Sequence, residues 1–223
     1  MLPRLAERFT IYAVDRRGRG ASPDPPGPYA IEREFEDIAE TVDAIGGEVD
    51  LLGHSYGAVC SLETALLSDH VRRLVLYEPP LPVGIEINPA GVVDRMDALL
   101  AAGDREGVIM TFFREIVRVP PAEIEALRRD PSWQGRLAAA HTIPRELRFA
   151  DHYEPDFERY AGLTVPTLLL VGADSPSFLV EPSRRLAEAI PDSRFTPLPG
   201  QQHNAMTTAP DLFLGEVVGF LSA

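Results

Sequence analysis

Lysine is absent from this sequence of 223 residues, in which all 21 basic side chains are arginines. The chain therefore cannot form a lysine Schiff base with a carbonyl substrate, and it lacks the usual anchor of pyridoxal phosphate. Cysteine is represented only by Cys60. A single cysteine excludes an internal disulfide, a multi-cysteine zinc site and a cysteine-ligated iron–sulfur cluster. We therefore expect a reducing, cytoplasmic environment.

Long apolar runs are also missing, since no stretch approaches the roughly 18 residues that a membrane span requires. The first eight residues lack the apolar core of a signal peptide. The formal net charge is −13, and a chain this acidic repels a phosphate backbone. We therefore expect neither a membrane nor a nucleic acid as partner. The apolar share of 45% and the charged share of 25% are typical of an ordinary globular protein.

Short apolar runs alternate with helical patterns in both halves of the sequence. Residues 9–14 (FTIYAV), 49–52 (VDLL), 71–77 (VRRLVLY) and 165–171 (VPTLLLV) are predicted strands, and FTPLP at 195–199 is predicted as an edge strand because it contains two prolines. Apolar residues at helical spacing predict helices before and after these runs, including one that ends at Gly46-Gly47, one that Pro182 opens, and a last one near Pro210 with Thr208 as cap. This alternation predicts a mostly parallel sheet with helices on both faces.

Residues 82–162 carry helical patterns only. We therefore predict an α/β core over residues 1–81 and 163–223, with a helical cap inserted at 82–162.

The sharpest local motif is Gly53-His54-Ser55-Tyr56-Gly57, which matches G-x-S-x-G between a predicted strand and a predicted helix. Small residues allow a sharp turn there, and the turn would hold Ser55 above the sheet near the positive end of the helix. Ser55 is therefore the predicted nucleophile. An N-cap serine in a glycine-bounded turn is the plainer interpretation of the same residues.

A serine hydroxyl needs a base, and the base needs an acid that fixes its tautomer. His203 lies in a loop before the last predicted helix, where catalytic residues of α/β sheets gather, and is the predicted base. Asp174 follows the strand at 165–171 and is the predicted acid, in the chain order nucleophile, acid, base. Glu78, just past the strand at 71–77, is the second candidate. The side chain of His54 is expected to point away, and His70, His141 and His152 are weaker bases.

With these motifs the sequence resembles the α/β-hydrolase superfamily, and within it small capped bacterial hydrolases. The matching segments are DRRGRGAS at 15–22, GHSYG at 53–57, LYEPP at 76–80, GADSP at 172–176 and GQQHNA at 200–205. The resemblance implies Ser55, Asp174 and His203 as the triad, and no cofactor and no metal.

One part of the family pattern has no counterpart. The resemblance implies eight strands and an HG-type loop after the third, which supplies half of the oxyanion hole, whereas this chain begins just before the fourth strand. The Tyr56 N–H is the predicted oxyanion donor, and the second has no candidate. Losing one such donor typically costs about 2.7–4 kcal/mol of transition-state stabilisation. We expect an N-terminally truncated α/β-hydrolase fold whose Met1 is an internal start.

The predicted function is a serine hydrolase that cleaves a carboxylic ester, thioester or lactone of a small to medium apolar substrate through an acyl-enzyme. The predicted pocket residues are Glu78, Phe112, Phe113, Trp133 and Met206, although Phe112 and Phe113 at helical spacing are more often core than pocket residues. Two alternatives stay open: a non-catalytic small-ligand-binding module of the same fold, and a cofactor-free perhydrolase or C–C hydrolase.

Overall fold

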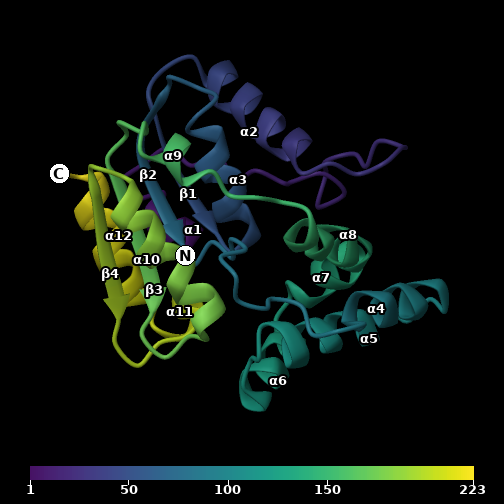
Figure 1. Ribbon diagram of the computed structural model, residues 1–223. Helices are drawn as coiled ribbons and strands as arrows, with labels where there is room; N and C mark the ends of the chain where they lie inside the picture. Colours follow the sequence, from purple (N-terminus) through teal and green to yellow (C-terminus); the bar gives the residue numbers. More distant parts are fainter. The chain divides into compact units, whose positions relative to one another are not determined.

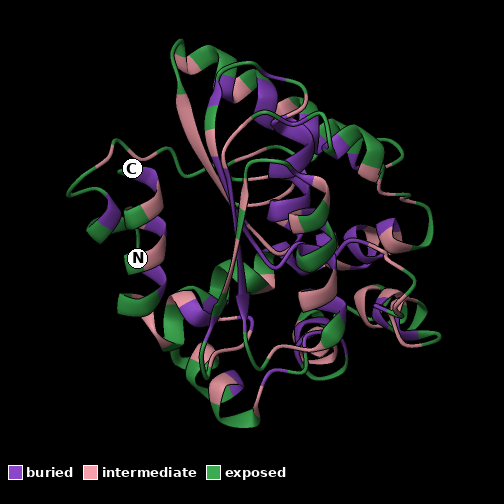
Figure 2. Ribbon diagram, turned by 60° about the vertical axis from the view of Figure 1, so that its left-hand side comes forward, coloured by how far each residue is buried: buried purple, intermediate pink, exposed green.

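Four parallel strands form one sheet in the order β1-β2-β3-β4 in a computed structural model that describes residues 1–223. The strands are β1 (Val49–His54), β2 (Val71–Tyr77), β3 (Thr167–Gly172) and β4 (Ser193–Leu198). Every residue of β3 is buried, whereas β4, with its proline, lies at an edge as predicted. Figure 2 shows buried residues concentrated in the central strands. The apolar sequence of β3 and of residues 74–77 in β2 follows from the position of these strands between neighbours and between helices.

Helices cover both faces of this sheet, and the side-chain alternation of the strands decides which face each residue serves. Val75 and Tyr77 of β2 pack with the last helix, α12 (Pro210–Leu221), and with Leu5 of the short α1 (Leu2–Leu5). Residues between them, such as Leu76, point to the other face, where α3 (Tyr56–Thr64) and α10 (Ser177–Ala189) pack against the strands (Figure 1). The remaining helices around the sheet are α2 (Glu32–Ile45), α9 (Phe157–Tyr160) and α11 (Ala205–Thr208).

The chain divides into two compact units. The first holds the sheet and consists of residues 1–14, 32–85 and 154–223; the second consists of residues 15–31 and 86–153. The loop at 15–31, which sequence analysis assigned to the core, therefore groups with the helical residues.

Three predicted elements differ from the structure. No strand forms over residues 9–14, where Tyr12 and Val14 are exposed, because no strand of the four-stranded sheet pairs with this segment. Pro182 does not open a helix but lies buried inside α10, which begins at Ser177, since Phe178 and its neighbours pack inward and compensate for one missing backbone hydrogen bond. Thr208 does not cap α12; its hydroxyl donates to Gln201 Oε1 at 2.7 Å.

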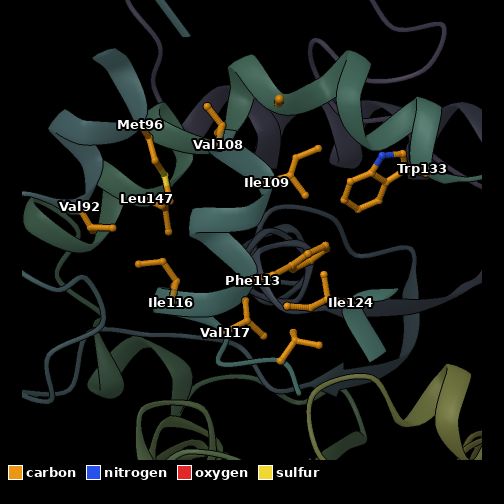
Figure 3. Close-up of a cluster of buried hydrophobic side chains, with 12 residues drawn as sticks. Val92, Met96, Val108, Ile109, Phe113, Ile116, Val117, Ile124, Trp133 and Leu147 are labelled. Carbon is orange, nitrogen blue, oxygen red and sulfur yellow. The ribbon is translucent and has the colours of Figure 1, made fainter. Parts of the chain in front are cut away.

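The regular elements of the second unit are all helical and lie within residues 86–153. Its elements are α4 (Val92–Ala101), α5 (Arg105–Thr111), the π-helical turn η1 (Phe112–Ile116), α6 (Pro121–Arg129), α7 (Trp133–Ala139), the 3-10 turn η2 (Ala140–Thr142), α8 (Ile143–Leu147) and the 3-10 turn η3 (Arg148–Asp151). Figure 3 shows the apolar side chains that converge at its centre. This cluster includes Met96, Ile109, Phe113 and Trp133, all of them buried.

A buried ion pair joins the loop at 15–31 to this helical unit. Glu146 on α8 is nearly enclosed, and it accepts hydrogen bonds from Arg16 at 3.0 Å and from Arg19 at 2.8 and 2.9 Å. Burial by itself would raise the pKa of Glu146, but the charges and hydrogen bonds of Arg16 and Arg19 outweigh burial and hold that pKa below its ordinary value. The carboxylate therefore stays ionised.

No helix in either unit has the length and apolar character needed to cross a membrane.

Candidate active site

Ser55 sits on a strained turn between β1 and α3. Its backbone adopts φ 56° and ψ −128°, a region that residues other than glycine rarely occupy and that is enriched at functional sites. The Ser55 N–H donates to the Tyr77 carbonyl at 2.8 Å, which ties the turn to the end of β2. Ser55 is partly exposed, and Tyr56 is the first residue of α3, so its N–H lies at the positive end of that helix.

Glu78 and His203 form the pair expected of a base and its acid. Glu78 follows β2 directly and is fully buried, and its Oε2 lies 2.5 Å from His203 Nδ1. The His203 side chain is only 8% exposed. A carboxylate at Nδ1 fixes the tautomer that carries its proton there, which leaves Nε2 as the proton acceptor.

The second oxygen of Glu78 is also engaged. The Gly172 N–H at the end of β3 donates to Glu78 Oε1 at 2.6 Å. Glu78 itself adopts φ 51°, so the chain tolerates an unfavourable backbone conformation just where the carboxylate meets both donors. A buried carboxylate that accepts two hydrogen bonds is held in one orientation.

Asp174 has a different position from the one expected of the acid. Its backbone N–H donates to the Gln201 carbonyl at 3.0 Å, but the residue is exposed. The structure thus pairs His203 with the second candidate of the sequence analysis, Glu78, whose buried side chain reaches the His203 ring, whereas Asp174 is exposed.

His54 was set aside in the sequence analysis, yet its ring contacts His203. Its Nε2 lies 3.0 Å from the His203 carbonyl oxygen, and the two ring centroids are 4.5 Å apart. The only sequence signal for this contact is that His54 precedes Ser55 directly. His70 lies exposed before the first residue of β2, at the opposite end of the parallel strands from Ser55.

The other predicted pocket residues belong to apolar packing in their own units. Phe113 and Trp133 are each 6% exposed in the buried cluster of the helical unit, and Phe112 packs against it. Met206 packs against the cluster between the sheet and α12. Their apolar character is thus explained by packing, without a ligand.

No group of three or more His, Cys, Asp or Glu side chains is arranged to hold a metal ion.

The strained serine turn, the buried carboxylate–imidazole pair and the parallel sheet are features of hydrolases of the α/β class. The chain belongs to the alpha/beta hydrolase family, whose model matches residues 1–216. A crystal structure of an alpha/beta hydrolase from Sphaerobacter thermophilus superimposes with a TM-score of 0.82 and 39% identity, covering 98% of this chain and 84% of that one.

Two curated bacterial relatives are hydrolases of named substrates. The 2-(acetamidomethylene)succinate hydrolase of Mesorhizobium japonicum is 26% identical, over 100% of this chain and 82% of its own length. The 2-hydroxy-6-oxo-6-(2'-aminophenyl)hexa-2,4-dienoic acid hydrolase of Metapseudomonas resinovorans is also 26% identical, over 100% of this chain and 77% of its own length.

Proposed function

We propose that this protein is a serine hydrolase in which Ser55 is the nucleophile, His203 the base and Glu78 the acid. The observation that carries the proposal is the 2.5 Å contact between the buried Glu78 Oε2 and His203 Nδ1. A fully buried carboxylate needs a compensating partner. An imidazole so oriented is what a serine hydroxyl needs to become nucleophilic.

The reaction proceeds in two halves. Ser55 Oγ attacks the substrate carbonyl carbon while His203 Nε2 accepts the hydroxyl proton, and Glu78 stabilises the imidazolium that forms. The Tyr56 N–H donates to the oxyanion of the tetrahedral intermediate. Collapse of the intermediate breaks the bond to the leaving group, which takes the proton from His203. Water then gives a proton to His203 and attacks the acyl-enzyme. The second tetrahedral intermediate collapses and releases the acid while His203 returns the proton to Ser55 Oγ, which regenerates the hydroxyl.

We propose a carboxylic ester, thioester or lactone of a small to medium substrate, because these carry a carbonyl that the serine can attack and a leaving group that His203 can protonate. The names of both curated relatives describe carboxylic acids, which favours a carboxylate-bearing substrate. Hydrolysis of a C–C bond in such a compound is therefore the second candidate. The substrate panel therefore needs acyl esters of graded chain length, each with and without a free carboxylate. No nucleic acid or membrane is a proposed partner, and the cytoplasm is the proposed location.

A fluorophosphonate probe tests the nucleophile directly, because it reacts only with an activated serine. We expect stoichiometric labelling of the protein and no labelling of Ser55→Ala. Ser177→Ala is the matched control, since Ser177 is an exposed serine at the start of α10, and it should be labelled like the parent chain. If the folded protein takes up no probe, the non-catalytic binding module becomes the better reading.

A further inference from the structure

His54 and Tyr77 end adjacent strands and both reach the loop that carries His203. They are partners in the register of β1 and β2, and their rings stack with centroids 5.3 Å apart. His54 Nε2 meets the His203 carbonyl at 3.0 Å. The Tyr77 hydroxyl donates to the Gln202 carbonyl and accepts from the Ala205 N–H at 3.3 Å. Three of the four residues from 202 to 205 thus have a backbone group bound to these two side chains.

The chemistry of the His54 contact fixes its protonation at one atom. A carbonyl oxygen only accepts hydrogen bonds, so His54 Nε2 must carry a proton and donate it. The Tyr77 ring is fully buried and also packs against Phe213 at 5.3 Å, which leaves its hydroxyl little freedom to move away from the loop. Both donors are therefore presented by rigid strand ends.

The serine turn itself does not need a histidine at position 54, since its sharpness comes from the strained Ser55 and the close packing of Gly53. The histidine at position 54 instead contacts the loop of His203, whose carbonyl oxygen accepts a hydrogen bond from its Nε2. Glu78 holds the ring of His203 at Nδ1, but a ring pivots about its own backbone, and a backbone free to shift would change the position of Nε2 that the proposed proton transfer from Ser55 requires. A displacement of about 1 Å in such a group can cost about a hundredfold in rate.

We infer that His54 and Tyr77 are positioning residues that clamp the backbone on either side of the His203 Cα, so that the imidazole is presented to Ser55 in one orientation. This inference rests on the proposed function. It assigns to His54 a role that differs from that of the base and requires only its Nε2–H.

Three variants separate the role of the N–H from that of the ring. His54→Phe keeps a ring at this position and removes the donor, whereas His54→Gln removes the ring and retains an N–H donor near the place of Nε2. We expect His54→Phe to lower kcat between about tenfold and about a hundredfold with KM unchanged, and His54→Gln to recover most of this loss. His70→Phe, an exposed histidine at the other end of the strands, is the control and should retain parental kcat.

Tyr77→Phe provides a second test that keeps the buried ring and removes only the hydroxyl. It should also lower kcat without changing KM. Because the two side chains hold one loop, the double variant His54→Phe/Tyr77→Phe should lose less than the product of the two single losses. Two fully multiplicative losses would overturn the common clamp.

A readout that is independent of turnover is the proton on His203 Nδ1, which is shared with Glu78 and should give a far-downfield proton NMR signal. We expect this signal to broaden or vanish through solvent exchange in His54→Phe and to persist in His54→Gln and His70→Phe, with thermal unfolding confirming that each variant is folded. Loss of the signal only in His54→Phe would support the clamp even if the parent chain hydrolysed nothing. An unchanged signal and unchanged kcat in His54→Phe would overturn it while leaving Ser55 catalysis intact.

Discussion

Glu78 contacts His203, a residue 125 positions further along the sequence, and the pair is completed by a third group, the Gly172 N–H, on the other oxygen of the carboxylate. The end of β2 therefore supplies the carboxylate, while the end of β3 supplies only a backbone donor.

This arrangement predicts different effects on kcat for two isosteric substitutions, Glu78→Gln and Asp174→Asn. Glu78→Gln keeps the size of the side chain but removes the negative charge that stabilises the His203 imidazolium, and its amide can stabilise the wrong tautomer. We expect kcat to fall by about 10³- to 10⁴-fold. Asp174→Asn changes an exposed carboxylate and should leave kcat within about threefold of the parent value, since exposed charges interact weakly.

Steady-state kinetics on the best ester of the panel measures both variants, and circular dichroism verifies their folding. A large loss in Asp174→Asn together with a small one in Glu78→Gln would restore Asp174 as the acid.

The two glycines of the serine turn have different roles, which the motif alone does not reveal. A Cβ on Gly53 would lie 2.6 Å from the Ala58 Cα and 2.6 Å from the Gly57 carbonyl oxygen, whereas a Cβ on Gly57 would meet nothing within 4 Å. Gly53→Ala should therefore lower the free energy of unfolding by about 1–3 kcal/mol. Gly57→Ala, within α3, should raise it by about 0.5–1 kcal/mol.

Urea unfolding measures both glycine variants under the same conditions. Equal destabilisation by the two alanines would show that the strand–helix packing at Gly53 is looser than the structure has it.

Much of the fold follows from local sequence patterns. The segments at 71–77 and 165–171 are rich in leucine and valine, and β2 and β3 occupy these places within two residues. The helical insertion was likewise visible as apolar residues at helical spacing. These elements were predictable because their apolar side chains pack against other residues of the same chain.

The acid of the site could not be chosen in the same way. Glu78 and Asp174 both follow strands directly, so local sequence places both at the same rim of the sheet. Strand order does not choose Glu78 either, since β3 and not β2 lies next to β4, the strand before the His203 loop. The choice depends on tertiary side-chain placement, because Glu78 is buried against His203 Nδ1 whereas Asp174 is exposed. The contact of His54 with the His203 loop is likewise a tertiary contact, between residues 149 positions apart.

The segment at 9–14 is a strand prediction that was wrong, since its pattern predicts a buried strand that does not form. Tyr12 and Val14 are 59% and 45% exposed, so replacing them removes little packing. We expect Tyr12→Ser to change the free energy of unfolding of this chain by less than about 0.5 kcal/mol. Leu76→Ala is the contrasting variant, because Leu76 is fully buried in β2, and it should cost about 2–5 kcal/mol.

Chemical denaturation of these two variants tests whether residues 9–14 pack in solution. A loss above about 1.5 kcal/mol for Tyr12→Ser would mean that this side chain is buried, as the strand prediction required.

The buried Glu146 makes the stability of the helical unit depend on acid. Its pKa is lower in the folded than in the unfolded chain, because the charges and hydrogen bonds of Arg16 and Arg19 outweigh the effect of burial. A carboxyl of this kind stabilises the fold fully above its unfolded pKa of about 4.3. That contribution is lost as the pH falls through the lower folded pKa.

Glu146→Gln should cost about 3–5 kcal/mol at pH 7, because Arg16 and Arg19 lose their shared partner. It should also flatten the decline of stability below about pH 4.3. Glu125→Gln, an exposed partner of Arg128 in the same unit, is the control and should match the parent chain within about 0.5 kcal/mol. Urea titrations from pH 7 to pH 3 measure these differences, and an acid limb as steep in Glu146→Gln as in the parent would contradict the assignment.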